Sequence, residues 1–315
     1  MMEYIFLLLG FAILLISGNM LVRAGVSLAT HLRVSTLAIG VTIVSLGTSA
    51  PEMVVSISAV FKDLPDIALG NVIGSNISNI GLVLGLTVLI LPLPVGLSSI
   101  NRDWPFMMLS SLIFYLFAFN GIISWIEGIV LLSLLTGYLY LTFRSSRREM
   151  LVTGHRFEKA DYSIFLAIIM VVISSAGLYF GAGWLVSSAE KIATNLGVSE
   201  RVIAVTLIAF GTSVPELATS LAAAVKKEMS ITIGNIIGSN IFNILAIPGI
   251  TGILKRITVS GEILFDIHYM LGISLLLFLL MIPFKNSKLN RKRGVFLLLS
   301  YATYIFIVFS MQGKV

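Results

Sequence analysis

Long apolar runs separated by short polar segments make up most of the chain. Each run is long enough to cross a membrane as a helix, which takes about 20 residues for a hydrocarbon layer of roughly 30 Å. Five runs precede and five follow the polar segment 144–161, which is rich in arginine. The pattern predicts ten membrane-spanning helices, near 3–22, 35–60, 67–92, 104–120, 124–143, 162–182, 199–225, 230–254, 263–283 and 294–311.

Two sequence motifs occur twice, always 164 positions apart. GTSAPE at 47–52 returns as GTSVPE at 211–216, and GNVIGSNISN at 70–79 returns as GNIIGSNIFN at 234–243. Alignment of residues 28–80 with 192–244 needs no gap and gives 26 identities in 53 positions. A shared apolar composition does not produce so many identities, so the chain contains an internal duplication.

The number of spans in each copy determines how the copies face. A duplicated unit with five crossings enters the membrane the second time in the opposite sense, which gives an inverted repeat, a common plan of secondary transporters. We therefore expect an all-α polytopic membrane protein of ten transmembrane helices, arranged as two five-helix inverted-topology repeats. The N-terminal repeat is 1–143, the linker 144–161, and the C-terminal repeat 162–315.

Composition agrees with a membrane protein and excludes several other classes. Hydrophobic residues make up 57% of the chain, charged residues 11%, and the mean hydropathy is +1.02, too apolar for a soluble domain. Cysteine is absent, which excludes disulfides and thiolate metal sites. The net charge of +6 comes from basic residues between the apolar runs and not from a patch of their own, so we expect a lipid bilayer and no nucleic acid as partner.

The distribution of Lys and Arg predicts the orientation. Segments on the linker's side carry 15 basic residues, and segments on the other side carry 6. Since basic loops stay in the cytoplasm, we expect a multi-pass protein of the cell membrane with a cytoplasmic linker and both termini extracellular.

Each repeat carries one acidic residue in the middle of an apolar run. Glu52 is the only charged residue between Arg33 and Lys62, and Glu216 is the only one between Arg201 and Lys226. A charge at mid-membrane costs from about 2.5 to over 10 kcal/mol, so something must compensate it. One explanation is an ion pair with a basic residue of another helix; a functional cation site is the other. Asp266 and His268 are the only further ionisable pair deep in a predicted span.

A proline next to each of these carboxylates predicts a break in the helix. Pro51 has no amide hydrogen for the carbonyl of Gly47, and Pro215 has none for Gly211, so backbone oxygens are released. Thr48 and Glu52 share a helix face, beside Ser49. Each break thus gathers a carboxylate, two hydroxyls and free carbonyls, as in an all-oxygen cation site. A simple proline kink with hydroxyls bonded back to the helix also explains a single copy.

The second motif adds a polar stripe and a stripe of small residues. Asn71, Ser75 and Asn79 recur every four residues, as do Asn235, Ser239 and Asn243. Gly70 and Gly74, with Gly234 and Gly238, predict close helix contacts. Asn with Gly-x-x-x-Gly also occurs in ordinary helix packing, but here the motif follows the Glu motif at the same distance in both halves, so we expect the motifs to meet at the centre.

These ligands suit hard cations. Ca²⁺ takes about 6 to 8 oxygens at roughly 2.3 to 2.6 Å, including carboxylates. The motifs contain no His and no thiolate, which argues against zinc or copper. Two carboxylates neutralise one Ca²⁺, and the same oxygens can instead hold Na⁺ or protons, so competition for shared ligands would couple an exchange.

The paired motifs resemble the two alpha repeats of the cation/calcium exchanger superfamily, specifically its prokaryotic sodium/calcium exchangers, over nearly the whole chain. The resemblance implies antiport of about three Na⁺ for one Ca²⁺ by alternating access, with spans 2, 3, 7 and 8 around the ions and spans 1 and 6 sliding. It implies no cofactor besides the transported Ca²⁺ and Na⁺. The implied ligands are Glu52, Glu216, Thr48 and Thr212 for Ca²⁺; Ser49, Ser213, Ser75 and Ser239, with carbonyls near Ser45 and Ala209, for Na⁺; and Asn79 and Asn243 at the middle site.

Two other functions stay open at this point. A Ca²⁺/H⁺ antiporter has the same fold, although its first motif typically reads Gly-Asn-Ala-x-Glu, and the best-known sodium exchangers end the second repeat in Asp where this chain has Asn243. A cation channel also lines a path with Glu and Ser, but channels usually build filters by symmetric oligomerisation. An enzyme is not expected, because no His-Glu-x-x-His or nucleophile constellation is present. No required protein partner is evident.

Overall fold

The computed structural model describes residues 2–153, 159–196, 211–282 and 288–312, which form helices joined by short connections. The helices are α1 (Met2–Leu32), α2 (Thr36–Ile39), α3 (Ser45–Thr48), α4 (Ala50–Phe61), α5 (Pro65–Ser78), α6 (Gly85–Ile90), α7 (Trp104–Phe119), α8 (Trp125–Val152), α9 (Ile164–Asn195), α12 (Val214–Val225), α13 (Met229–Leu254), α14 (Gly261–Met281) and α15 (Arg291–Gln312). Three π-helical turns are η1 (Gly40–Val44), η2 (Asn79–Leu84) and η3 (Ser99–Asp103), and four strands of two residues each are β1 (Leu93–Pro94), β2 (Ile122–Ile123), β3 (Ile257–Thr258) and β4 (Lys288–Leu289).

The described helices confirm an all-helical membrane fold. Seven of them are long and apolar enough to cross a membrane, or eight if the bent pair Thr36–Thr48 and Ala50–Phe61 is one crossing. Helices α7 and α12 are shorter, with 16 and 12 residues. Helix α12 is the second part of the predicted span 199–225, and most of the first part lies outside the described residues. The count of ten spans therefore stays a prediction.

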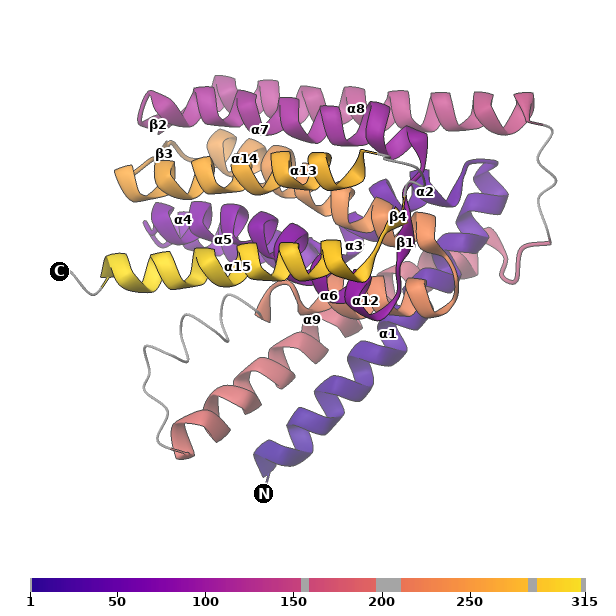
Figure 1. Cartoon of the computed structure of the whole chain (residues 1–315), viewed down its shortest axis with the longest axis horizontal. Coiled ribbons are helices and arrows are strands. Elements are labelled where there is room, and N and C mark those ends of the chain that lie inside the picture. The colour runs from indigo at the N-terminus through magenta and orange to yellow at the C-terminus, as the bar shows by residue number, and fades with distance from the viewer. Residues whose placement is uncertain (1, 154–158, 197–210, 283–287, 313–315) are drawn as a thin grey trace.

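Helix α13 lies at the centre of the bundle (Figure 1). Nearly every residue from Ile231 to Gly252 is buried, whereas α15 exposes most of its surface, including Phe306. A helix that is apolar on all sides is buried inside a protein or in lipid, and α13 is buried in protein: it contacts α3, α4, α5, α7, α8 and α12. The second copy of the second motif, residues 234–243, lies on α13 and is therefore enclosed by helices from both halves of the chain.

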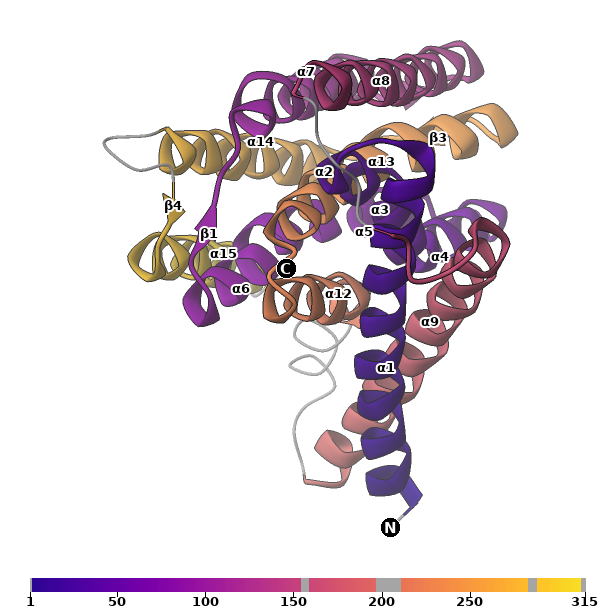
Figure 2. The same ribbon diagram turned by 90° about the vertical axis from the view of Figure 1, so that its right-hand side faces the viewer.

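Helices α1 and α9 form a pair that runs obliquely away from the other helices (Figures 1 and 2). Their backbones touch where Gly10 faces Gly181: a Cβ atom on Gly10 would lie 2.8 Å from the Gly181 carbonyl oxygen. Further along, Gly18 of α1 lies against the backbone of Ala218 in α12. Small residues thus let α1 and α9 pack closely on each other, and let α1 pack closely on α12.

Two short antiparallel strand pairs join the halves of the chain. Strand β1 of the first half pairs with β4 of the second, and β3 of the second half pairs with β2 of the first. Strands β1 and β3 are 164 positions apart, the offset of the repeat. Figure 1 shows the β2–β3 pair at the left edge of the molecule and the β1–β4 pair to the right of its centre. The equivalent strands β1 and β3 are therefore well separated along the long axis.

The turns after α4 and α12 have the same conformation. Asp63 and Lys227, again 164 positions apart, have φ angles of 58° and 65°. In each turn the next residue donates its N–H to a carbonyl five positions earlier: Leu64 to Ala59 and Glu228 to Ala223, both at 2.9 Å. This is the Schellman pattern of helix ends. The duplication in the sequence thus extends to local backbone geometry.

The segment expected to link the two halves is partly helical. Helix α8 continues through residue 152, so the first nine residues of 144–161 extend the fifth predicted span as a helix. Arg147 of this extension donates to the carbonyl of Leu32, at the end of α1. The arginines predicted to lie in a connection therefore lie largely on a helix.

Candidate cation site

The first repeat breaks its second span at the predicted proline. Helix α3 ends at Thr48, Ser49 has φ −85° and ψ 3°, and α4 begins at Ala50 with Pro51 in its first turn. The two pieces differ in direction by 46°. In the second repeat, Ser213 has nearly the same conformation, φ −89° and ψ 0°, directly before α12. The prolines thus place the Glu of each motif in the first turn of a helix.

Both of these glutamates are fully buried, and neither forms an ion pair with a Lys or Arg of the described chain. Oε1 of Glu216 accepts hydrogen bonds from the hydroxyls of Ser49 at 3.2 Å and Ser239 at 3.4 Å. The two carboxylates are close enough to interact electrostatically. Both carboxylate oxygens of Glu52, and Oε2 of Glu216, have no hydrogen-bond partner among the described residues. Three carboxylate oxygens are thus available to a ligand.

Hydroxyls of one repeat meet hydroxyls of the other. Thr48 Oγ1 lies 3.3 Å from Ser239 Oγ, and Ser75 Oγ lies 3.3 Å from Thr212 Oγ1. The two contacts are equivalent, because Thr212 corresponds to Thr48 and Ser239 to Ser75 in the repeat. The Glu motif of each half therefore contacts the second motif of the opposite half, as the sequence predicted.

Two of the predicted ligands are buried asparagines without hydrogen-bond partners. Asn79 begins η2 and Asn243 lies in α13, both fully buried. No amide atom of either side chain has a hydrogen-bond partner among the described residues, and the same holds for the hydroxyl of Ser213. A buried polar group without a partner costs about 1–3 kcal/mol. Such groups are expected at sites that bind a ligand.

The predicted backbone ligands are less well supported. The carbonyl of Ser45 accepts from the N–H of Ser49 at 2.9 Å and from the hydroxyl of Thr48 at 3.2 Å. The hydroxyl of Ser45 donates to the carbonyl of Val41 at 2.6 Å. Ala209 lies outside the described residues. The oxygens of Ser45 are thus already engaged in this conformation.

Comparison with known proteins agrees with this geometry. The profile of the family described as sodium/calcium exchanger protein matches residues 2–144 and 166–310. The putative antiporter CaxA of Alkalimonas amylolytica is 36% identical over 313 residues, covering 97% of this chain and 98% of the relative. Sodium/calcium exchanger MaX1 of Methanosarcina acetivorans is 30% identical over 347 residues, 98% of each. A solved structure of the sodium-calcium exchanger NCX_Mj is 33% identical and superposes with a TM-score of 0.82, over 97% of this chain and 98% of that one.

The chain belongs to the sodium/calcium exchanger protein family. It is therefore a multi-pass membrane transporter of the cation/calcium exchanger superfamily and not an enzyme. The two buried carboxylates therefore belong to a protein of an antiporter family. Which cation is exchanged, and which ion each residue binds, must be inferred from the residues of this chain.

Two of the predicted polar residues, Asn71 and Asn235, bond neighbouring helices to each other, and Asn235 also reaches the cluster of hydroxyls, because its Oδ1 accepts from the hydroxyl of Thr48 at 3.1 Å. Asn71 Nδ2 donates to the Glu52 carbonyl at 3.0 Å and to the Ser56 hydroxyl at 2.9 Å. Its counterpart Asn235 donates to Ser220 at 3.2 Å. Ser56 and Ser220 were not predicted, although they are identical in the two copies of the repeat. Because both serines are repeated, the sequence could have indicated these Asn–Ser hydrogen bonds between consecutive spans.

A second unpredicted pair lies where α5 and α13 meet. Asn76 Nδ2 lies 3.4 Å from the carbonyl of Asn240 and 3.5 Å from Sδ of Met270. Asn240 donates to the carbonyl of Ile236 at 2.7 Å. These asparagines are part of both copies of the motif, so their repetition again marked them. Their contacts indicate helix packing at the centre of the exchanger.

The small residues of the two copies are not equivalent. A Cβ on Gly234 would lie 2.8 Å from the Leu37 carbonyl, and one on Gly238 would lie 2.6 Å from Ser45 Oγ, so α13 packs closely on α2, η1 and α3 as predicted. No described atom lies within 4 Å of a Cβ on Gly70 or Gly74. The predicted close contact of that pair is therefore not found among the described residues; the segment equivalent to 37–45 is 201–209, outside them.

The other ionisable residues of the spans have partners away from the site. Asp266 accepts from the hydroxyl of Tyr304 at 3.0 Å, whereas the His268 ring contacts Tyr115 OH at 3.2 Å. No cluster of three or more His, Asp or Glu side chains occurs in the described part of the chain. A cation at the centre would therefore be held mainly by two carboxylates with hydroxyl and amide oxygens.

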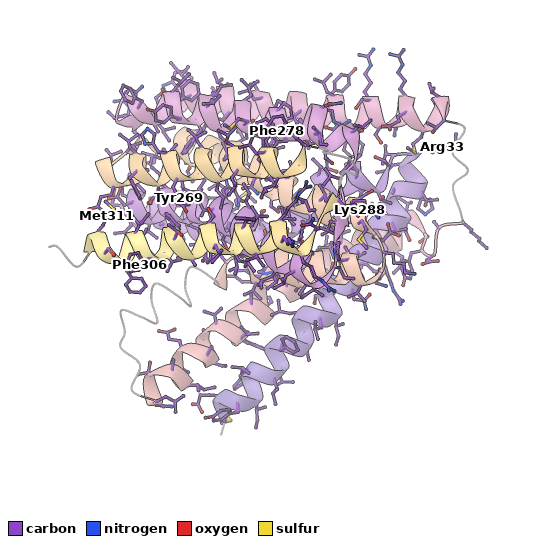
Figure 3. The ribbon with its side chains drawn as sticks, in the orientation of Figure 1. Arg33, Tyr269, Phe278, Lys288, Phe306 and Met311 are labelled. Atoms are coloured by element: carbon purple, nitrogen blue, oxygen red, sulfur yellow. The ribbon has the colours of Figure 1, made fainter. Side chains whose placement is uncertain are left out.

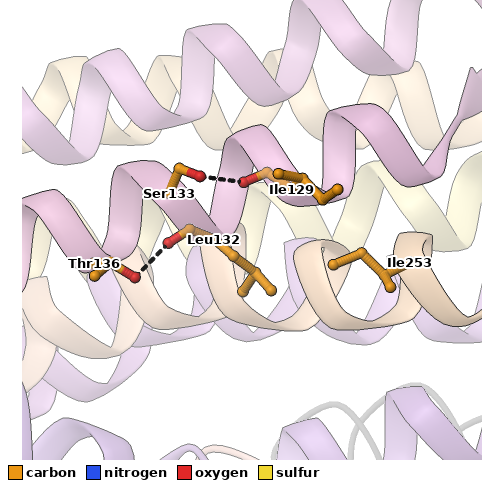
Figure 4. Close-up of a pocket in the computed structure, with 5 residues that line it drawn as sticks. All are labelled: Ile129, Leu132, Ser133, Thr136 and Ile253. Atoms are coloured by element: carbon orange, nitrogen blue, oxygen red, sulfur yellow. Dashed lines mark hydrogen bonds between the residues drawn. The ribbon is translucent and has the colours of Figure 1, made fainter.

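A lipid-facing groove between α8 and α13 has no comparable ligands (Figure 4). Its hydroxyls donate to their own helix: Ser133 to the Ile129 carbonyl at 2.7 Å and Thr136 to the Leu132 carbonyl at 2.8 Å. The rest of the lining is aliphatic. This groove is thus not a second cation site.

Proposed function

We propose that the exchanger carries Na⁺ and Ca²⁺ in opposite directions by alternating access, with the ions bound between Glu52 and Glu216. The observation that carries the proposal is the meeting of the repeats at these carboxylates: Ser49 of the first repeat donates to Glu216 of the second, and three buried carboxylate oxygens have no described partner. Without a basic neighbour, a bound cation is what would compensate two negative charges in the membrane.

The donor set fits Ca²⁺ in number and type. Glu52 and Glu216 supply four carboxylate oxygens, and Thr48 and Thr212 add two hydroxyls, which meets the lower end of the about 6 to 8 oxygens that Ca²⁺ takes. The flanking hydroxyls of Ser49, Ser213, Ser75 and Ser239, with the amide oxygens of Asn79 and Asn243, would hold Na⁺ at the sides and the middle.

Sodium is proposed as the counter-ion because of the relatives. MaX1 and NCX_Mj, which this chain matches over nearly its full length, are named as sodium/calcium exchangers. The motif GTSAPE also differs from the Gly-Asn-Ala-x-Glu form expected of proton/calcium exchangers. Two protons would neutralise the same two carboxylates, so a Ca²⁺/H⁺ antiporter is the second candidate.

The inverted ten-span arrangement of 1–143 and 162–315 about the linker belongs to the same proposal. The strand pairs exchanged between the halves and the equal turns at Asp63 and Lys227 support it. In Figure 3, Arg33 lies near one end of the long axis and Met311 near the other, with Lys288 between them on the side of Arg33. This separation supports a cytoplasmic linker and extracellular termini in the cell membrane.

Flux into vesicles made with the purified full-length chain tests the proposal. Vesicles loaded with Na⁺ and diluted into Na⁺-free medium should take up radioactive Ca²⁺, and uptake should persist when an ionophore collapses any pH gradient. Vesicles with equal Na⁺ on both sides are the control. Uptake that follows an imposed pH gradient and ignores Na⁺ would establish the proton antiporter instead, and currents at channel rates would exclude both antiporters.

A further inference from the structure

Ser175 of α9 lies directly against the break in the first repeat. A Cβ atom on Gly47, the residue before Thr48 and Ser49, would lie 2.5 Å from Ser175 Oγ. A real Cβ does not approach an oxygen so closely, so glycine at 47 makes room for this hydroxyl. Ser175 belongs to the oblique α1–α9 pair (Figure 2), outside the four spans that carry the predicted ligands. Ser175 thus connects the α1–α9 pair to the helix break beside the predicted cation site.

The Ser175 hydroxyl is buried but has no hydrogen-bond partner among the described residues. Serines within apolar helices usually donate to a carbonyl three or four residues earlier. Its neighbour Ser174 does so, to Met170 at 2.6 Å and to Val171 at 3.0 Å. By the same rule Ser175 would donate to the carbonyl of Val171 or Val172, and it does neither. The Ser175 oxygen instead lies against Gly47.

Gly47 has a carbonyl that suits this donor. In a continuous helix that carbonyl would accept from the N–H of residue 51, but Pro51 has none. The Ser175 hydroxyl therefore lies against a residue whose backbone oxygen has lost its usual partner. Helix α9 packs against both α3 and α4, so the Ser175 hydroxyl is held beside this segment.

Resting on the function proposed above, we propose that Ser175 is a positioning residue that fastens α9 to the break of the first repeat when a cation is bound. A cation between Glu52 and Glu216 attracts the oxygens of Thr48 and Ser49, which turns the adjacent Gly47 peptide. The Ser175 hydroxyl then donates to the Gly47 carbonyl and holds the break in its ion-bound conformation. Ser175 does not itself bind the ion.

Transport by Ser175→Ala tests this role, with Ser174→Ala as the matched control. Ser175→Ala should raise the half-saturating Ca²⁺ concentration about fivefold, the factor expected from one ordinary hydrogen bond, with little change in the maximal rate. Ser174→Ala should leave the half-saturating concentration as in the parent, because its bond is internal to α9. An unchanged value for Ser175→Ala, or equal increases for both variants, would overturn the proposal.

A second measurement is independent of the counter-ion. The chain has no cysteine, so Ser175→Cys carries the only thiol. Its alkylation rate should fall when Ca²⁺ is added, and this effect should disappear when Glu52→Gln is combined with it. Ca²⁺-independent alkylation would overturn the proposal even if exchange is observed. If parent vesicles show no Na⁺-dependent uptake but Ca²⁺ still protects the thiol, the counter-ion is wrong and the role of Ser175 stands.

Discussion

The hydroxyl of Ser49 donates a hydrogen bond to Oε1 of Glu216 over 3.2 Å, although the residues are 167 positions apart. The equivalent pair, Ser213 and Glu52, is not bonded: neither the hydroxyl nor the carboxylate has a partner among the described residues. Two copies of one motif thus have different hydrogen bonds in one conformation. The carboxylate of the first repeat is the less satisfied one.

This difference predicts unequal effects of removing the two hydroxyls. Without ions, Ser49→Ala should lower the free energy of unfolding by about 1–3 kcal/mol, because a buried carboxylate loses a donor, whereas Ser213→Ala should leave it nearly unchanged. Thermal unfolding of the purified variants in ion-free buffer measures this. Equal losses in both variants would show that the hydroxyls are equivalent.

Neutralising either central carboxylate should abolish Ca²⁺ exchange. Glu52→Gln or Glu216→Gln removes half of the negative charge that balances Ca²⁺, and breaking a buried charge pair costs about 3–5 kcal/mol, enough to reduce affinity more than a hundredfold. Uptake into vesicles measures the loss. Asp266→Asn is the matched control, since Asp266 is an acidic residue of a span bonded to Tyr304 away from the site, and it should retain exchange.

Calcium should stabilise the parent protein and not the carboxylate variants. A ligand present at a hundredfold excess over its dissociation constant adds about 2.7 kcal/mol to the free energy of unfolding. Unfolding with added Ca²⁺, and again after a chelator removes it, should therefore differ in the parent. If Glu216→Gln is stabilised to the same extent, Ca²⁺ binds elsewhere.

A third carboxylate at the site should tighten Ca²⁺ binding. Asn243 is buried with an unpaired amide, and Asn243→Asp replaces one of its atoms by a charged oxygen of the same size. We expect the half-saturating Ca²⁺ concentration to fall about tenfold, and more Na⁺ to be exchanged per Ca²⁺, because hard cations prefer charged oxygens. Asn240→Asp is the contrasting variant: its amide donates to Ile236, so it should lose stability and gain no affinity. Weaker Ca²⁺ binding by Asn243→Asp would place that residue outside the site.

The glycines of the second motif should differ in their tolerance of a methyl group. Gly238→Ala would bring Cβ against the backbone of Val41 and 2.6 Å from Ser45 Oγ, so we expect a loss of about 1–3 kcal/mol, as for other overpacked sites. Gly183→Ala is a control in α9, where no described atom is near the added methyl, and it should be tolerated. Thermal unfolding compares them, and equal stability of the two variants would contradict the close packing of α13 on α3.

The sequence by itself determined the repeat, the helix breaks and the isolation of each carboxylate within its own span. Pro51 and Pro215 cannot donate to the preceding turn, which favours a break beside Glu52 and Glu216 without reference to the rest of the fold. The absence of Lys and Arg from those spans likewise needs no coordinates. Spacing by four placed Asn71, Ser75 and Asn79 on one face, and the 164-residue offset repeated this in the second half.

Only the tertiary structure decided which partner each of these groups has. Asn71 and Asn79 share a stripe, yet Asn71 bonds Ser56 while Asn79 has no described partner. The pairing of β1 with β4, and the position of Ser175 against Gly47, join segments that no local pattern connects. The physical reason is range: helix breaks and faces depend on neighbours within one or two turns, whereas a hydrogen bond forms only within about 3 Å and so depends on how distant helices are placed.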